Sequence, residues 1–174
     1  MQRQEARPGK ICNDRTMSVV LDEIDCALIA HLQEEGDLPN VELARRTGLS
    51  PAASSRRVRA LRDAGIITGV HARVSADAVG VRLEAFVFVT LREQTDRSDQ
   101  AFADALGGIA AVVRADRIAG RDDALLHVVT SDARSLQKVL QQLQRVGAAR
   151  VTTMLRLGEI KPPSPWPVEQ GPRS

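Results

Sequence analysis

The chain has 174 residues, of which 26% are charged and 43% hydrophobic, as is typical of a folded protein of one or two domains. No apolar run reaches the roughly eighteen residues of a membrane span, and the N-terminus lacks the apolar centre of a signal peptide. Two cysteines are too few for a disulfide framework or a zinc site, and an aromatic content of 2% disfavours recognition by base stacking. We therefore expect a cytoplasmic protein with no membrane segment, metal or cofactor.

The first predicted helix covers residues 21–37 and follows an N-terminal extension, residues 1–20, that we expect to be flexible. Asp22 can cap this helix, and Gly36 ends it. An apolar stripe at helical spacing gives the helix a buried side, formed by Ile24, Leu28, Ile29 and Leu32.

Residues 40–65 predict a short helix, a tight turn and a second helix. Asn40 can cap the first of these helices, and Gly48 can end it in a left-handed conformation. Ser50 can cap the next helix, with Pro51 at its first position, where a missing N–H costs nothing. On a helical wheel, one side packs inward and carries Ser54, Val58 and Leu61. The opposite side faces solvent and carries Ala52, Ser55, Arg56, Arg59 and Asp63.

Positive charge is concentrated in this region of a chain whose net charge is only +2. Seven arginines lie between residues 40 and 73, against two carboxylates, Glu42 and Asp63. A slim first turn followed by arginines suits a helix that enters the major groove of DNA. The alternative is an ordinary three-helix domain with a solvated basic face. The candidate DNA-binding residues are Arg45, Arg46, Ser50, Ala52, Ser55, Arg56, Arg57, Arg59 and Arg73.

These candidates are expected to play different roles. Arg56 and Arg59 should approach bases or phosphates, because an arginine bound to guanine is the commonest specific contact. Arg57 points partly sideways and can bind either a phosphate or a carboxylate of the same chain. Arg45 and Arg46 should contact the DNA backbone rather than bases, and Arg73 is a weaker candidate of the same kind.

Residues 65–75 are rich in β-branched residues and predict a small wing or an extended exit strand. They complete a winged helix-turn-helix domain, residues 21–75, which a linker, residues 76–82, joins to the second half. The second half, residues 83–161, predicts four strands and two amphipathic helices. In chain order these are the strand 83–93, helix 99–109, strands 112–119 and 124–130, a helix capped by Asp132, and strand 150–160.

The order strand, helix, strand, strand, helix, strand defines a ferredoxin-like βαββαβ sandwich, so the fold class is α+β. The first strand is apolar on both faces, although the helices of this fold cover only one face of the sheet. An uncovered apolar face of this size implies a partner, and we infer a homodimer with stacked sheets. The proline-rich segment that follows, residues 162–174, is expected to be irregular.

Three segments resemble the Lrp/AsnC, or feast/famine, family of regulators. They are LDEIDCALIAHLQEEG, NVELARRTGLSPAASSRRVRALRDAGIITGV and IAGRDDALLHVV, and the resemblance spans about residues 20–161. It implies a winged helix-turn-helix joined to a ferredoxin-like effector domain. It also implies dimers that assemble into octamers or larger rings, and a response to amino acids. The chain would then be a sequence-specific transcriptional regulator that binds double-stranded DNA.

The resemblance further implies an effector loop between dimers, matched here by Gly120, Arg121, Asp122 and Asp123. Turn N–H groups could bind the carboxylate of an amino acid while Asp123 binds its ammonium group. Thr152 and Thr153 could add hydrogen bonds. Relatives often carry an aromatic residue after the final Asp, where this chain has Ala124. From the residues alone, the same loop is also an ordinary hairpin turn.

We find no catalytic or metal-binding pattern in the sequence. His31, His71 and His127 show no ligand spacing, and no Ser-His-Asp order or carboxylate pair stands out. Two alternatives remain beside a regulator. One is a haem-pathway decarboxylase, which resembles this two-domain arrangement, and the other is an architectural DNA-binding protein that ignores small molecules.

Overall fold

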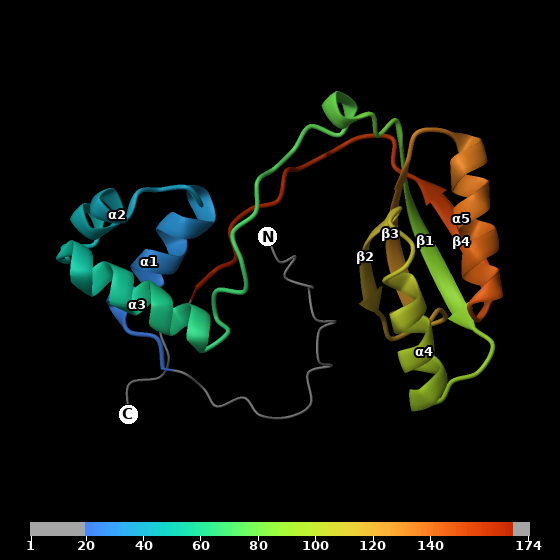
Figure 1. The fold of residues 1–174 in the computed structure, drawn as a ribbon, viewed down its shortest axis with the longest axis horizontal. Helices are drawn as coiled ribbons and strands as arrows, with labels where there is room; N and C mark the ends of the chain where they lie inside the picture. The colour runs from blue at the N-terminus through green and yellow to red at the C-terminus, as the bar shows by residue number, and fades with distance from the viewer. Residues whose placement is uncertain (1–19, 169–174) are drawn as a thin grey trace, which may run out of the picture. The chain divides into compact units, whose positions relative to one another are not determined.

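The computed structural model describes residues 20–168, and they form two compact units (Figure 1). The DNA-binding unit comprises residues 20–73 together with residues 162–168, and the effector unit is Val74–Lys161. The expected N-terminal extension and the last residues of the proline-rich segment lie outside the described residues.

The DNA-binding unit contains three helices, α1 Glu23–Glu34, α2 Asn40–Arg46 and α3 Pro51–Asp63. Asp22 caps α1 as expected, because its carboxylate accepts the backbone N–H of Asp25 at 2.8 Å. The carboxylate of Asp25 accepts the N–H of Asp22 in return, which completes a capping box. Sequence and structure therefore agree on where the first helix begins.

The turn between α2 and α3 also follows the prediction, with one exception. Gly48 is left-handed with φ of 68°, and Ser50 caps α3 by accepting the N–H of Ala53 at 3.2 Å. The predicted cap at Asn40 is wrong, because Pro39 occupies the N-cap position and α2 begins at Asn40 itself. The Asn40 side chain donates instead to the carbonyl oxygen of Pro51 at 2.8 Å and ties α2 to the start of α3.

The core of the DNA-binding unit lies between these helices. It is formed by the buried side chains of Leu28, Ile29, Leu43 and Leu61. The predicted inward side of α3 is confirmed, since Ser54 and Leu61 are buried and Val58 packs against the core. Ser54 is fully buried, and its hydroxyl has no hydrogen-bond partner among the described residues.

The segment 65–75 forms no strand within the described part of the chain, so the predicted exit strand is absent there. Ile66 and Ile67 pack against the helical core directly after α3. From Thr68 onward the backbone runs without a pairing strand, because no neighbouring strand in this unit offers it hydrogen bonds. A short 3-10 turn, Asp77–Val79, then precedes the first strand of the effector unit.

The effector unit has the predicted ferredoxin-like fold. Its elements are β1 Leu83–Leu91, α4 Asp96–Leu106, β2 Val112–Arg117, β3 Ala124–Thr130, α5 Ala133–Arg145 and β4 Ala148–Leu155. The four strands form one antiparallel sheet in the order β2-β3-β1-β4. Asp132 caps α5 by accepting the N–H of Ser135 at 2.7 Å, as expected.

Several boundaries differ from the prediction. Helix α1 is shorter than the predicted range 21–37 and ends at Glu34, with Glu35 and not Gly36 at its end. Strands β1 and β2 each end two residues early, at Leu91 and Arg117.

Two further differences have identifiable reasons. Helix α4 begins three residues earlier than expected, since Thr95 and Ser98 form a capping box before its first turn. Strand β4 ends at Leu155 rather than near residue 160. The N–H of Arg156 still donates to the carbonyl oxygen of Glu84 at 2.9 Å, but β1 begins at Leu83 and offers no pairing partner beyond it.

Both helices of the effector unit pack on the same face of the sheet. Ala85, Val87 and Val89 of β1 share one buried cluster with residues of α4 and α5, among them Phe102 and Leu143. The other face has no helix in the effector unit. Its side chains come from alternate residues of the strands and include Phe86, Phe88, His127, Thr152 and Met154.

Candidate DNA interface and effector loop

Helix α3 presents the predicted reading surface to solvent. Ala52 and Ser55 are exposed in its first half, and Arg56 and Arg59 are exposed along the same side. Neither Arg56 nor Arg59 forms a salt bridge with any residue of the described range 20–168. Ser50 lies at the start of this surface, although its hydroxyl is used as the helix cap. Small residues therefore line the first turn, and free guanidinium groups follow it.

Arg62 extends this surface and was not among the predicted DNA-binding residues. It is exposed in the last turn of α3, and no carboxylate of the described residues pairs with it. Its spacing of three residues from Arg59 was the available signal, because residues three apart are neighbours on a helix. Three guanidinium groups of α3 are therefore free to meet an anionic partner.

Arg57 has a different environment from Arg56 and Arg59. Its Nη1 atom lies 2.6 Å from Oδ2 of Asp22 and 2.8 Å from Oδ1 of Asp25. The N–H of Asp25, and then Arg57, lower the pKa of the Asp22 carboxyl. Of the two roles that the sequence left open for Arg57, the structure gives it the carboxylate within the chain. Arg57 thus fixes α3 against the N-terminus of α1.

The arginines of α2 are also paired within the chain. Arg45 makes two hydrogen bonds to the carboxylate of Glu42, at 2.7 and 2.6 Å, and Arg46 makes another at 2.9 Å. Arg46 also lies 2.9 Å from Glu35. Hydrogen bonds from Arg45 and Arg46 lower the pKa of Glu42 to about 2. The positive charge of α2 is therefore largely balanced locally, while Arg73 is exposed in the segment after α3.

In the effector unit, the loop between β2 and β3 is held by its two aspartates. The Asp123 carboxylate accepts the N–H of Leu91 at 2.8 Å through one oxygen and the side-chain amide of Gln94 at 3.1 Å through the other. The N–H of Asp123 donates to the carbonyl oxygen of Val89 at 2.8 Å. Asp123 thus connects the loop to the end of β1, which sequence reasoning did not anticipate.

Asp122 is paired on the other side of the loop. Its Oδ1 accepts from the hydroxyl of Thr90 and from Nη2 of Arg150, both at 2.9 Å. Arg150, followed by Thr90, lowers the pKa of the Asp122 carboxyl. Arg150 was missed from the sequence, although it stands two residues before Thr152 and so shares its face of β4. Arg121, in contrast, is exposed.

The remaining predicted effector residues do not form one surface. Thr152 pairs with Phe88 on the uncovered face of the sheet, whereas Thr153 pairs with Val87 on the face that the helices cover. Only one of the two threonines can therefore face a given ligand. Ala124 is the first residue of β3, next to the loop, and Gly120 is exposed within the loop.

The described residues, 20–168, hold neither a metal-binding cluster nor a membrane-spanning helix. No group of three or more histidine, cysteine or acidic side chains is placed to hold a metal ion. Within the same residues, no helix is both long and apolar enough to cross a membrane.

A helix-turn-helix with free arginines, joined to a ferredoxin-like domain, defines a class of DNA-binding regulator with two domains. The family described as winged helix-turn-helix DNA-binding matches residues 21–68, and the Lrp/AsnC ligand binding domain matches residues 84–166. A leucine-responsive regulatory protein of Rhizobium meliloti is 38% identical over 145 residues, which cover 82% of this chain and 93% of the relative. The chain belongs to the Lrp/AsnC family of transcriptional regulators.

Other relatives agree with this assignment. The HTH-type transcriptional regulator LrpA of Mycobacterium tuberculosis is 33% identical over 81% of this chain and 93% of its own length. A transcriptional regulator of Neisseria meningitidis, solved in complex with L-methionine, has a TM-score of 0.76 and 32% identity over 84% of this chain and 96% of its own. A feast or famine regulatory protein of M. tuberculosis, also complexed with L-methionine, has a TM-score of 0.73 and 32% identity, and covers 81% of this chain and 95% of its own. Because these relatives are regulators, the decarboxylase alternative has no support.

Proposed function

We propose that this protein is a sequence-specific transcriptional regulator of the cytoplasm that reads double-stranded DNA with Arg56 and Arg59. The observation that carries this proposal is the contrast in pairing among the arginines. Arg45, Arg46 and Arg57 are bound to carboxylates of the same chain, whereas Arg56 and Arg59 are exposed on one side of α3 without such partners among residues 20–168. Unpaired guanidinium groups on a helix of this shape suit base edges and phosphates.

The small residues at the start of α3 support a close approach to DNA. Ala52 and Ser55 are exposed and short, so they leave room for the first turn of α3 to enter a major groove. Arg56 and Arg59 then reach base edges or phosphates further along the helix. The fixed position of α3 supports this role, because Arg57 and the Asn40 side chain hold both its middle and its start.

A homodimer follows from the uncovered face of the effector sheet. Phe86 and Met154 are partly exposed on that face, next to each other on β1 and β4. Stacking two such sheets would bury both faces and give each dimer two copies of α3. Each dimer would then contact two successive major grooves of a roughly palindromic site. We propose that dimers assemble further, into an octamer or a larger ring.

An amino acid bound at the loop between β2 and β3 would modulate this assembly. Each oxygen of the Asp123 carboxylate accepts one hydrogen bond within the chain and keeps lone pairs for an ammonium group. Arg121 is exposed beside it and can meet a carboxylate. The two relatives solved with L-methionine support an amino acid as the effector class. Such an effector acts only by binding two assemblies with different affinity.

The proposal is tested by comparing free with paired arginines. We expect the double variant Arg56→Ala/Arg59→Ala to lose at least about thirtyfold in operator affinity, since each specific arginine contact contributes about 1–3 kcal/mol. The matched control Arg45→Ala/Arg46→Ala removes the same charge from α2 and should lose less than about tenfold. Operators are first found by genome-wide mapping of bound sites, and affinities are then measured by gel shift. Equal losses in the two double variants would reject the role given to Arg56 and Arg59.

A further inference from the structure

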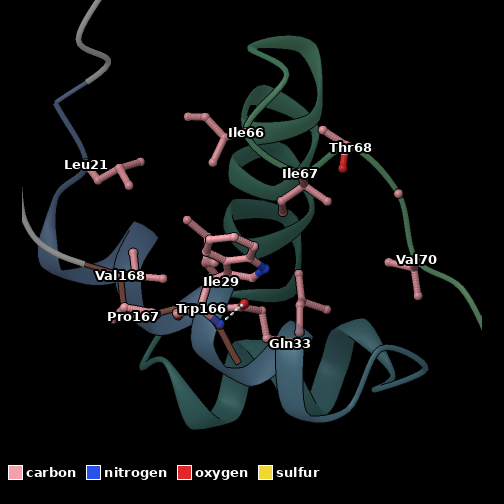
Figure 2. Close-up of a pocket in the computed structure, with 12 residues that line it drawn as sticks. Leu21, Ile29, Gln33, Ile66, Ile67, Thr68, Val70, Trp166, Pro167 and Val168 are labelled. Carbon is pink, nitrogen blue, oxygen red and sulfur yellow. Dashed lines mark hydrogen bonds between the residues drawn. The ribbon is translucent and has the colours of Figure 1, made fainter. Parts of the chain in front are cut away.

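A groove on the DNA-binding unit holds part of the proline-rich segment. An open pocket of ≈ 530 Å³ is bordered by α1, by the residues that follow α3, and by Trp166, Pro167 and Val168. Figure 2 shows these three residues beside Ile29 and Gln33 of α1. Val168 also packs against the buried core of the unit. Residues 162–168, called the strap below, thus belong to the DNA-binding unit although they follow the effector unit in sequence.

Gln33 binds the backbone of the strap at one residue. The N–H of Trp166 donates to Oε1 of Gln33 at 2.7 Å, and Nε2 of Gln33 donates to the carbonyl oxygen of Trp166 at 3.0 Å. Pro165 and Pro167 flank Trp166 and have no N–H, so the amide between them is a distinctive point of attachment. One side chain therefore satisfies both polar backbone atoms of Trp166.

The composition of the strap favours docking over free movement. Four of its seven residues are prolines, which stiffen the backbone and reduce the conformational entropy lost on binding. Recognition of stiff proline-rich segments in apolar grooves is a recurring mode of binding. Leu157 and Ile160, between β4 and the strap, are fully exposed. The Trp166 side chain is itself 82% exposed. The strap is therefore held by the hydrogen bonds of Gln33 to the Trp166 backbone and by Val168, not by the indole ring.

We propose that this groove is the docking site of residues 162–168, and that the docked strap restrains the DNA-binding unit during operator binding. The unit is then attached to the effector unit through two segments, the linker after Arg73 and the strap, instead of one. This inference rests on the function proposed above. A dimer restrained in this way presents its second copy of α3 to the operator at a higher effective concentration once the first copy has bound. Release of the strap would weaken binding to a full operator and leave binding to a half-site unchanged.

Docking can be followed without a label because Trp166 is the single tryptophan and the chain has no tyrosine. Docking fixes the backbone of Trp166 while its ring stays 82% exposed, so we expect its fluorescence anisotropy in the full-length protein to be higher than in a variant that releases the strap. Gln33→Met keeps the size of the side chain and removes both hydrogen bonds. The equilibrium constant for docking of the strap should therefore fall by about tenfold. Gln137→Met, on the exposed side of α5, is the matched control and should leave the anisotropy unchanged.

A chain that ends at Lys161 provides a second, independent variant. Removing the strap should lower the melting temperature of the DNA-binding unit. Gln33→Met should lower the melting temperature of the full chain but not that of the shortened chain. Equal effects of Gln33→Met in the full and shortened chains would mean that Gln33 acts within α1 and not on the strap. That result, or a Trp166 anisotropy in the unmodified protein no higher than in Gln33→Met, would overturn the docking.

The restraint itself is tested with two duplexes, a full operator and a half-site. Gln33→Met and the shortened chain should each lose about tenfold in affinity for the full operator and less than about twofold for the half-site. If both release the strap and the ratio of the two affinities is unchanged, the proposed restraint is wrong. Failure of the DNA-reading proposal looks different, because Arg56→Ala/Arg59→Ala would then leave half-site binding intact.

Discussion

The two units of this protein leave different features unsatisfied. The DNA-binding unit buries its apolar side chains and pairs the arginines of α2, but it leaves guanidinium groups free on α3. The effector unit does the reverse. It satisfies the aspartates of its loop, since Asp122 pairs with Arg150 and Asp123 accepts from neutral donors, but it leaves the face of its sheet that carries Phe86 and Met154 without a helix. Free charge calls for an anionic partner and uncovered apolar area for a second sheet, so each unit indicates its own kind of partner.

The largest expected effect concerns the uncovered sheet face. Met154 and Leu155 are neighbours on β4 and are both 55% exposed, but they lie on opposite faces of the sheet. Met154→Asp would place an unpaired charge in the proposed dimer interface and should raise the dimer dissociation constant by at least about a hundredfold. Leu155→Asp, on the helix-covered face, should leave the dimer intact. Sedimentation at several concentrations decides this, and a stable Met154→Asp dimer would contradict sheet stacking.

The second prediction separates the structural role of Asp123 from its proposed role in ligand binding. Asp123→Asn keeps the shape of the side chain and, with the Gln94 amide flipped, both of its hydrogen bonds, while it removes the charge. We expect its melting temperature without ligand to stay within about 2 °C of the original. A saturating amino acid should raise the melting temperature of the original protein by about 5 °C and that of the variant hardly at all.

Asp123→Ala completes this test. It removes the acceptor for the N–H of Leu91 and should lower the melting temperature even without ligand, because that N–H is partly buried. Thermal shift measurements across a panel of amino acids compare all three proteins. An undiminished shift in Asp123→Asn would show that the ligand does not bind through this carboxylate.

A smaller effect is expected inside α3. The buried hydroxyl of Ser54 has no partner among the described residues, so Ser54→Ala should raise the free energy of unfolding by about 1 kcal/mol. Ser55→Ala is the matched control, because Ser55 is exposed on the same helix and gains only helix propensity. Urea unfolding of both variants measures the difference. A Ser54→Ala protein less stable than Ser55→Ala would show that the hydroxyl is satisfied.

The smallest effect concerns the paired arginines of α2. The pKa of Glu42 is lowered from 4.5 to about 2, so the stability that its ion pairs contribute is present above pH 4.5 and is lost as the pH falls towards 2. Compared with Glu42→Gln, the original protein should be slightly more stable at pH 7, and the difference should vanish near pH 2. The groups are exposed, so the difference is small. A difference that grows on acidification would contradict this pairing.

Much of the fold could be predicted from local sequence signals. Asp22, Ser50 and Asp132 cap helices as expected, since a cap depends on residues only three positions away. The inward side of α3 and the order of strands followed from apolar periodicity. The prediction for Asn40 was wrong, because Pro39 occupies the cap position and the Asn40 amide donates to Pro51, eleven residues away.

The pairing of charges could not be predicted, because it depends on residues brought together only by the fold. Arg57 meets carboxylates 35 and 32 residues away, and Arg150 meets Asp122 across 28 residues. Composition likewise described the proline-rich segment as irregular, which is true of the backbone of residues 162–168. It carried no sign that Gln33, 133 residues earlier, would bind Trp166.

The central claim, that free arginines on α3 read a DNA sequence, is tested most directly by a ratio of affinities. The measurement compares the affinity for a mapped operator with that for random duplex at one salt concentration, in the original protein and in Arg56→Ala/Arg59→Ala. We expect a ratio of about a thousand or more in the original protein, and a fall of at least tenfold in the variant. A ratio near one in the original protein, as an architectural protein would give, or an unchanged ratio in the variant, would contradict the account.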